Sequence, residues 1–178
     1  MRIFLCSTLF VITFSGTVIF AQNASDKCAI KGWVEDKGVN KDIFIHSGPS
    51  TTSKNIGEIK AVTEDGDETI VEITGYKNGW LKIRKAESIE GDVVFEGEGW
   101  IPASRVTANV QRPDGNSKKA VTLYSGPALS SKKSGTIPSE TLVTIVGYNC
   151  FGLKVKYKGK TGWLPKGYMC GNPVTTCS

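Results

Sequence analysis

The residues best suited to covalent chemistry in this sequence are its cysteines. Beyond the apolar N-terminal stretch lie four of them: Cys28, Cys150, Cys170 and Cys177. An even number of cysteines is typical of disulfide-bonded secreted proteins, and four cysteines allow three pairings. A zinc site is the alternative, but the spacings do not fit one and no histidine is near in sequence. We therefore expect two disulfide bonds, with the pairing open, and no bound metal.

Groups that support catalysis are scarce. His46 is the only histidine, and one histidine cannot build a zinc site. The acidic run 64–68 contains paired carboxylates that suit calcium, but it lacks the spacing of a twelve-residue calcium loop, so a solvated loop is favoured. No glycine-rich loop precedes a helix, which leaves nucleotide binding without a basis. The sequence predicts no enzyme activity and no cofactor.

A row of lysines is the most concrete chemical feature. Lys154, Lys156 and Lys158 alternate with apolar residues over 153–158. In a strand, this alternation places the lysines on one wet side, about 6–7 Å apart. Such a row can bind a polyanion; the alternative is a solubilising face that protects a sheet edge. Nucleic acid is not expected, because no aromatic residues interleave with the lysines along the row.

Charge is shared unevenly along the chain. Residues 22–117 contain twelve Lys/Arg and sixteen Asp/Glu, a net charge of −4. Residues 118–178 contain nine Lys and a single acid, Glu140, a net charge of +8. This asymmetry indicates that the two halves present different surfaces to different partners.

One stretch of the sequence occurs twice. The first copy opens with Ser47-Gly48-Pro49 and closes with Gly99-Trp100-Ile101-Pro102. The second opens with Ser125-Gly126-Pro127 and closes with Gly162-Trp163-Leu164-Pro165. Insertions near 64–67 and 88–98 lengthen the first copy, and the larger one predicts an overlong hairpin with Phe95 exposed to a partner. Because Trp100 and Trp163 repeat after glycine, we expect them to pack within their domains.

Apolar residues recur with period two, and no segment shows sustained helical periodicity. Lys158-Gly159 supplies a tight hairpin turn. Short strands with turn signals between them predict an all-β protein made of two tandem small five-stranded barrels. The expected domains are 28–107 and 118–177, joined by a linker at 108–117.

Residues 1–21 resemble a secretory signal. Arg2 supplies the positive start, the following residues are mostly apolar, and Ala21 fits the cleavage rule before Gln22. The alternative is an uncleaved membrane anchor, but hydroxyl residues interrupt the apolar run. We expect a secreted or periplasmic protein with no membrane span in its mature form.

Each copy resembles a bacterial Src-homology-3-like (SH3b) domain. The resemblance rests on the openers 43–49 and 121–127, on Ile56-Gly57 and 134–137 before the second strand, and on the Gly-Trp-hydrophobic-Pro closers. It implies a ligand groove beside the closing turn. The corresponding positions are His46, Trp80, Pro102 and Arg105 in the first copy, and Tyr124, Gly152, Pro165 and Tyr168 in the second. The second copy lacks the groove tryptophan at Gly152, where Phe151 can supply an aromatic ring, and Arg105 replaces an aromatic residue in the first.

The resemblance implies a non-catalytic, exported binding module for peptidoglycan or an associated cell-envelope polymer. The candidate ligand-binding residues are Trp80, Pro102, Tyr124, Pro165, Tyr168, Lys154, Lys156 and Lys158. The expected ligand is a cell-wall peptide or an anionic envelope polymer. Two alternatives stay open: an extracytoplasmic protein-interaction adaptor, and a regulator or inhibitor of an exported hydrolase.

Overall fold

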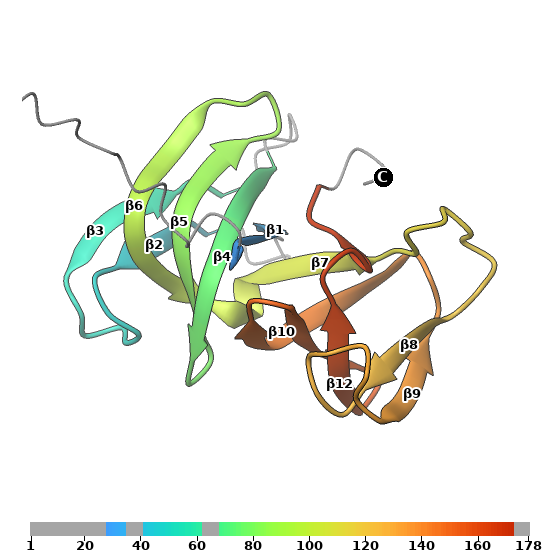
Figure 1. Cartoon of the computed structure of the whole chain (residues 1–178). Coiled ribbons are helices and arrows are strands. Elements are labelled where there is room, and N and C mark those ends of the chain that lie inside the picture. The colour runs from blue at the N-terminus through green and yellow to red at the C-terminus, as the bar shows by residue number, and fades with distance from the viewer. Residues whose placement is uncertain (1–27, 35–40, 62–67, 173–178) are drawn as a thin grey trace, which may run out of the picture.

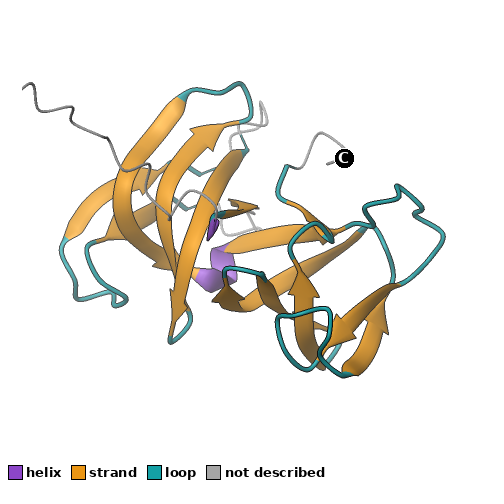
Figure 2. Cartoon of the chain, viewed as in Figure 1, coloured by secondary structure: helices purple, strands orange, loops and turns teal. Residues whose placement is uncertain are grey.

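The structure is a computed structural model that describes residues 28–34, 41–61 and 68–172 of the 178-residue chain. Over these ranges thirteen strands form one antiparallel sheet, which curls into two lobes (Figure 1). A short 3₁₀ turn, η2 (Ala103–Arg105), follows the sixth strand (Figure 2). The all-β prediction is confirmed. No helix in this described part of the chain has the length and apolar character needed to cross a membrane.

The strands are divided between the two lobes, with one strand lying between them. The first lobe contains β1 (Ile30–Val34), β2 (Ile43–His46), β3 (Asn55–Ile59), β4 (Thr69–Lys77), β5 (Trp80–Ser88) and β6 (Val93–Pro102). The second lobe contains β8 (Val121–Tyr124), β9 (Lys133–Ile137), β10 (Thr141–Asn149), β11 (Gly152–Tyr157), β12 (Lys160–Pro165) and β13 (Met169–Cys170). The strand β7 (Val106–Val110) lies between the lobes and pairs with strands of both.

The lobes are joined through β1 and β7. The strand β1 pairs with β4 on one side and with β7 on the other, and β7 also pairs with β10. Part of the predicted linker, 108–110, is therefore strand. Val106, Ala108 and Val110 alternate along β7 and are fully buried. This stretch forms a strand because burying these apolar side chains stabilises it more than exposure to water would.

Period-two alternation builds the core as predicted. In β11, Leu153 and Val155 are fully buried while Lys154 and Lys156 are exposed. The predicted Lys158-Gly159 turn is confirmed, since Tyr157 pairs with Lys160 across it. Both turn residues have positive φ, 42° and 78°, as a tight hairpin with right-handed strand twist requires.

The long hairpin of the first copy is present, but its aromatic residue is not exposed. Ala86 of β5 is fully buried opposite Phe95 of β6. Phe95 is half-buried and packs against the core, where its ring covers Gly57 and Gly99. Those glycines leave the space that the ring fills. The exposed apolar residues near the tip are instead Val93 and Val94, at 56% and 42%.

Candidate functional site: a groove on the second lobe

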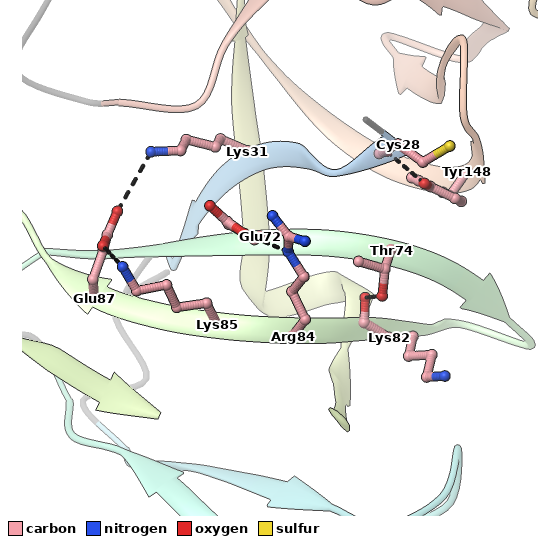
Figure 3. A network of polar contacts seen from close by, with 9 residues as sticks. All are labelled: Cys28, Lys31, Glu72, Thr74, Lys82, Arg84, Lys85, Glu87 and Tyr148. Carbon is pink, nitrogen blue, oxygen red and sulfur yellow. Dashed lines mark hydrogen bonds and ion pairs between the residues drawn. The ribbon is translucent and has the colours of Figure 1, made fainter. Parts of the chain in front are cut away.

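A disulfide bond fixes the loop that forms one wall of the site. Cys28, just before β1, is bonded to Cys150, in the turn between β10 and β11. Beside it, the hydroxyl of Tyr148 donates a 2.6 Å hydrogen bond to the Cys28 carbonyl oxygen (Figure 3). The predicted use of these cysteines in a disulfide is confirmed. Cys170 is buried and also disulfide-bonded, and Cys177 lies outside the described residues.

An apolar groove of about 540 Å³ opens next to this disulfide. Three segments form its walls: the loop after β8, the β10–β11 turn and the turn after β12. Its lining residues are Pro127, Ala128, Leu129, Cys150, Phe151, Pro165 and Lys166. Leu129 and Phe151 are 58% and 68% exposed, which is unusual for large apolar side chains in a small domain. The volume lies in the range of pockets that bind small ligands.

Backbone hydrogen bonds hold the walls of the groove in place. The Phe151 amide donates to the Asn149 side-chain oxygen at 3.1 Å, an Asx turn that shapes the β10–β11 connection. The Lys166 amide donates to the Phe151 carbonyl at 2.7 Å, and the Ser131 amide donates to the Ala128 carbonyl at 2.9 Å. The groove is thus largely preformed, which lowers the entropic cost of binding.

Of the second-copy residues predicted to form the groove, only Pro165 lines it. Tyr168 packs against the hydrophobic core, and Tyr124 is half-buried on the outer face of the sheet. Gly152 is buried because β12 passes too close for a side chain; an added Cβ would lie 2.4 Å from the Leu164 carbonyl oxygen. Phe151 supplies the aromatic ring instead. Leu129 was not predicted, and its position in a polar loop gave no signal of its role.

The corresponding first-copy residues are engaged with one another. The rings of His46 and Trp80 meet edge-on, with centroids 5.3 Å apart. The His46 Nδ1 donates to the Ser53 carbonyl at 2.9 Å, and Trp80 lies opposite Pro102 across β5 and β6. Arg105 donates from Nη2 to the Lys41 carbonyl at 3.0 Å. The predicted groove residues of the first lobe therefore already contact other residues of that lobe.

The lysine row is shorter than predicted. Lys154 and Lys156 project from β11 as expected, but Lys158 lies in the following turn, and its Nζ sits 5.3 Å from the centre of the Tyr157 ring. The tight turn requires a positive φ there, which removes Lys158 from the strand's alternation. Within the described ranges, none of the three forms an ion pair with a carboxylate.

Several basic residues of the first lobe, in contrast, form ion pairs. Arg84 Nε contacts Glu72 at 2.6 Å, and Lys85 and Lys31 both contact Glu87 (Figure 3). The hydrogen bond from Lys85 is the main reason that the pKa of Glu87 lies below its ordinary value. The ion pairs connect β1, β4 and β5. Lys154 and Lys156 of the second lobe have no such carboxylate partner within the described residues.

The part of the chain that the structure describes holds no group of three or more histidine, cysteine or acidic side chains arranged to bind a metal ion. The predicted acidic loop falls mainly at 64–67, outside the described residues, and so does the predicted signal at 1–21.

Comparisons with known proteins were made by sequence and by structure. Among solved structures, the chain is similar to NlpC2 and NlpC1 from Trichomonas vaginalis, each at 17% identity with a TM-score of 0.32. The matches cover 81% and 79% of this chain but 48% and 45% of those chains, so it spans about half their length. No curated protein matches. A family model for the bacterial SH3 domain matches residues 119–169, so this segment of the second lobe is a bacterial SH3 domain.

Proposed function

We propose that the protein is a non-catalytic, exported binding module whose second lobe recognises peptidoglycan or an associated cell-envelope polymer. In this proposal the chain contains two tandem five-stranded SH3-like barrels after a cleaved signal peptide. The observation that carries it is the apolar groove at Leu129, Phe151 and Pro165, located on the segment that matches a bacterial SH3 domain.

The chemistry of the groove suits a wall peptide. Stem peptides combine small apolar side chains with free carboxylates. The floor of the groove is apolar, Lys166 lies at its edge, and the lobe carries a net charge of +8 over residues 118–178. Apolar contacts then provide affinity in the groove, while the surrounding lysines attract the anionic polymer. The disulfide at Cys150 fits an extracytoplasmic setting, where such bonds persist.

Binding to purified cell-wall sacculi tests the groove. The double variant Leu129→Ala/Phe151→Ala should weaken binding by about tenfold or more, because it removes both large apolar side chains from the walls. Phe44→Ala, which removes a similarly exposed aromatic residue (49%) from the first lobe, is the matched control and should leave binding unchanged. Sacculi stripped of stem peptides should bind the wild type no more tightly than the double variant. Equal binding by the wild type and the double variant would exclude the groove.

The contribution of the lysines has a separate test. Reversing Lys154, Lys156 and Lys158 to Glu should reduce sacculus binding and its salt dependence, since exposed charges are screened within about 8–10 Å at physiological ionic strength. Reversing Lys118, Lys119 and Lys132 changes the net charge equally and serves as the control. If both triple variants lose the same affinity, only the net charge of the lobe matters, and no particular row is involved.

A second candidate function is supported by the long hairpin of the first lobe. Val93 and Val94 are exposed near its tip, and the two lobes differ in charge. Exposed apolar residues at the tip of an arm suit a protein contact. In this alternative the chain is an adaptor, or a regulator of an exported hydrolase, and Val93→Ser/Val94→Ser would abolish capture of one protein partner while leaving sacculus binding intact.

A further inference from the structure

A row of three side chains crosses the outer face of the second lobe, beside the groove but not within it. Trp163 of β12 pairs with Tyr124 of β8 on one side and with Lys154 of β11 on the other. Their neighbours Leu123, Leu164 and Leu153 are buried, so the pleat turns this row outward. None of the three residues lines the groove.

The aromatic residues of this row do not pack against the hydrophobic core. Trp163 and Tyr124 are only half-buried, and neither is among the partly buried residues that pack against the hydrophobic core. The expectation that Trp163 packs within its domain is therefore not supported. A large aromatic ring left on the outer face beside an exposed lysine is a typical element of a binding surface.

The first lobe has a corresponding row, but there other residues of the lobe already contact it. We call this row closed. His46, Trp100 and Lys82 occupy the corresponding positions in register. The Trp80 ring meets the His46 ring edge-on, and Glu98 holds Lys82 in an ion pair at 2.7 Å. Two of the three residues of this row, His46 and Lys82, therefore already have partners within the lobe.

Two sequence differences open the row in the second lobe. Gly152 stands where the first copy has Trp80, because each pairs with the proline that ends the closing strand. Thr161 stands where the first copy has Glu98, because each directly precedes the Gly-Trp pair. Tyr124 therefore has no tryptophan against it, and Lys154 has no carboxylate partner within the described ranges.

We propose that the Tyr124–Trp163–Lys154 row is a second binding site, for a saccharide chain that carries carboxylate groups. An indole or phenol ring packs against the C–H face of a sugar ring, and an ammonium group pairs with a carboxylate on that sugar. Directly opposed residues lie about 4.5–5.5 Å apart across neighbouring strands. One sugar ring with its acidic substituent can thus contact Trp163 and Lys154 together, and the next ring of the chain reaches Tyr124.

Charge favours this ligand over a neutral glycan. Lys156 lies two residues beyond Lys154 on the same exposed side of β11, about 6–7 Å away. Residues 118–178 contain Glu140 as their only acidic residue, so no carboxylate of this segment other than Glu140 can compete for the lysines. A polyanion without rings would satisfy the lysines but would leave the aromatic pair unused.

Three probes separate these chemistries: an oligogalacturonate (ring and carboxylate), a chito-oligosaccharide (neutral ring) and poly-glutamate (carboxylate without a sugar ring). With the full-length mature protein, we expect the oligogalacturonate to bind most tightly and to quench tryptophan fluorescence. Trp163→Ala should weaken its binding by about tenfold and remove the quenching. Trp100→Ala, the equivalent change in the closed row, should affect neither.

Exchanging one residue between the two copies gives a variant that retains both Trp163 and the fold. Thr161→Glu places the carboxylate of the first copy beside Lys154 at an exposed position, and it should close the site and weaken oligogalacturonate binding by about fivefold. Glu98→Thr, the reverse change, should not reduce binding. Circular dichroism confirms that each variant is folded.

Two results would overturn the proposal. The first is equal oligogalacturonate binding by the wild type and Thr161→Glu. The second is poly-glutamate binding as tight as oligogalacturonate binding and insensitive to Trp163→Ala, which would reveal a purely electrostatic surface. The site is also independent of the groove, since Leu129→Ala/Phe151→Ala should leave oligogalacturonate binding intact while reducing sacculus binding.

Discussion

Single residues decide what each lobe can bind, and Gly152 is the clearest case. Its position is that of Trp80 in the first copy, where the ring reaches His46. In the second lobe the backbone of β12 occupies the space of a side chain, with the Leu164 carbonyl oxygen 2.4 Å from an added Cβ. The missing tryptophan is thus enforced by backbone packing, and the aromatic ring moves to the neighbouring Phe151.

The close approach at Gly152 predicts that even a methyl group is costly there. Gly152→Ala should lower the free energy of unfolding by about 1–3 kcal/mol, because backbone atoms cannot move aside as a flexible side chain can. Gly135→Ala is the control: its added Cβ meets nothing within 4 Å, and its φ is not positive. Chemical denaturation measures both variants, and similar stabilities for the two would contradict the packing argument.

The pKa of the Asp114 carboxyl lies well below its ordinary value. Hydrogen bonds from Arg112, and then from the Asn116 amide, lower its pKa from 3.8 to about 2. Because the folded-state pKa is depressed, the stabilising contribution is present above the unfolded-state pKa and is lost as the pH falls through about 2. A carboxyl titration by NMR should show this low pKa, and Arg112→Gln should raise it. An unchanged pKa in that variant would assign the shift to the backbone amide alone.

At the scale of elements, β1 is the strand on which the assembly depends. It is five residues long, yet it pairs with both β4 and β7. Trp33 and Val34 of β1 are buried. The Cys28–Cys150 bond and the Tyr148 hydrogen bond fix the N-terminal end of β1 to the second lobe. The C-terminal end of the described chain contacts it as well, since a Cβ at Gly171 would lie 2.3 Å from the Lys31 carbonyl carbon.

Removal of the inter-lobe disulfide should release β1. For Cys28→Ser/Cys150→Ser we expect a loss of about 2–4 kcal/mol in unfolding free energy, because the bond closes a long loop in the unfolded chain. Amide hydrogen exchange in β1 should also increase more than exchange in β11. Tyr148→Phe, which removes only the hydrogen bond to Cys28, should cost about 0.5–1.5 kcal/mol. Unchanged exchange in β1 of the cysteine variant would show that strand pairing alone holds it.

The long hairpin contains a packed part and a free tip. Phe95→Ala should cost about 1–3 kcal/mol, since its ring covers Gly57 and Gly99 but remains partly exposed. Val94→Ser, one residue away and 42% exposed, should change stability by no more than about 0.5 kcal/mol. Thermal unfolding distinguishes the two. A stable Phe95→Ala protein would mean that the whole arm is dispensable.

At the scale of the whole molecule, the two lobes share one hydrogen-bonded sheet rather than meeting at a flexible joint. The sheet runs without interruption from β3 at one edge to β9 at the other. A hydrogen bond from Thr107 Oγ1 to the Val143 carbonyl, 3.1 Å long and buried, adds to the β7–β10 pairing. A surface on one lobe is therefore held in a defined orientation relative to the other.

Continuity of the sheet predicts that the lobes unfold together even when the chain between them is cut. A protease site placed in the exposed turn at 113–115 would separate β7 from β8, yet β7–β10 pairing and the disulfide would still connect the pieces. The cut protein should elute as one species without reductant and should show one unfolding transition. Two separate transitions in calorimetry would indicate independent lobes.

The sequence by itself determined the local features of this protein. Alternation of apolar and polar residues in β11 predicted which side chains are buried, and Lys158-Gly159 predicted a turn, because both depend on neighbours within a few residues. The even number of cysteines predicted disulfide bonds from composition alone, but it left their pairing open.

The tertiary structure decided whatever depends on contacts between distant residues. Cys28 and Cys150 are 122 positions apart, and no local pattern selects that pairing. Strand register sets Trp163 beside Lys154 and Tyr124, and the path of β12 makes Gly152 obligatory and leaves the groove to Phe151 and Leu129. These features follow from how the sheet closes, which is fixed only when the apolar faces of strands far apart in sequence pack against each other.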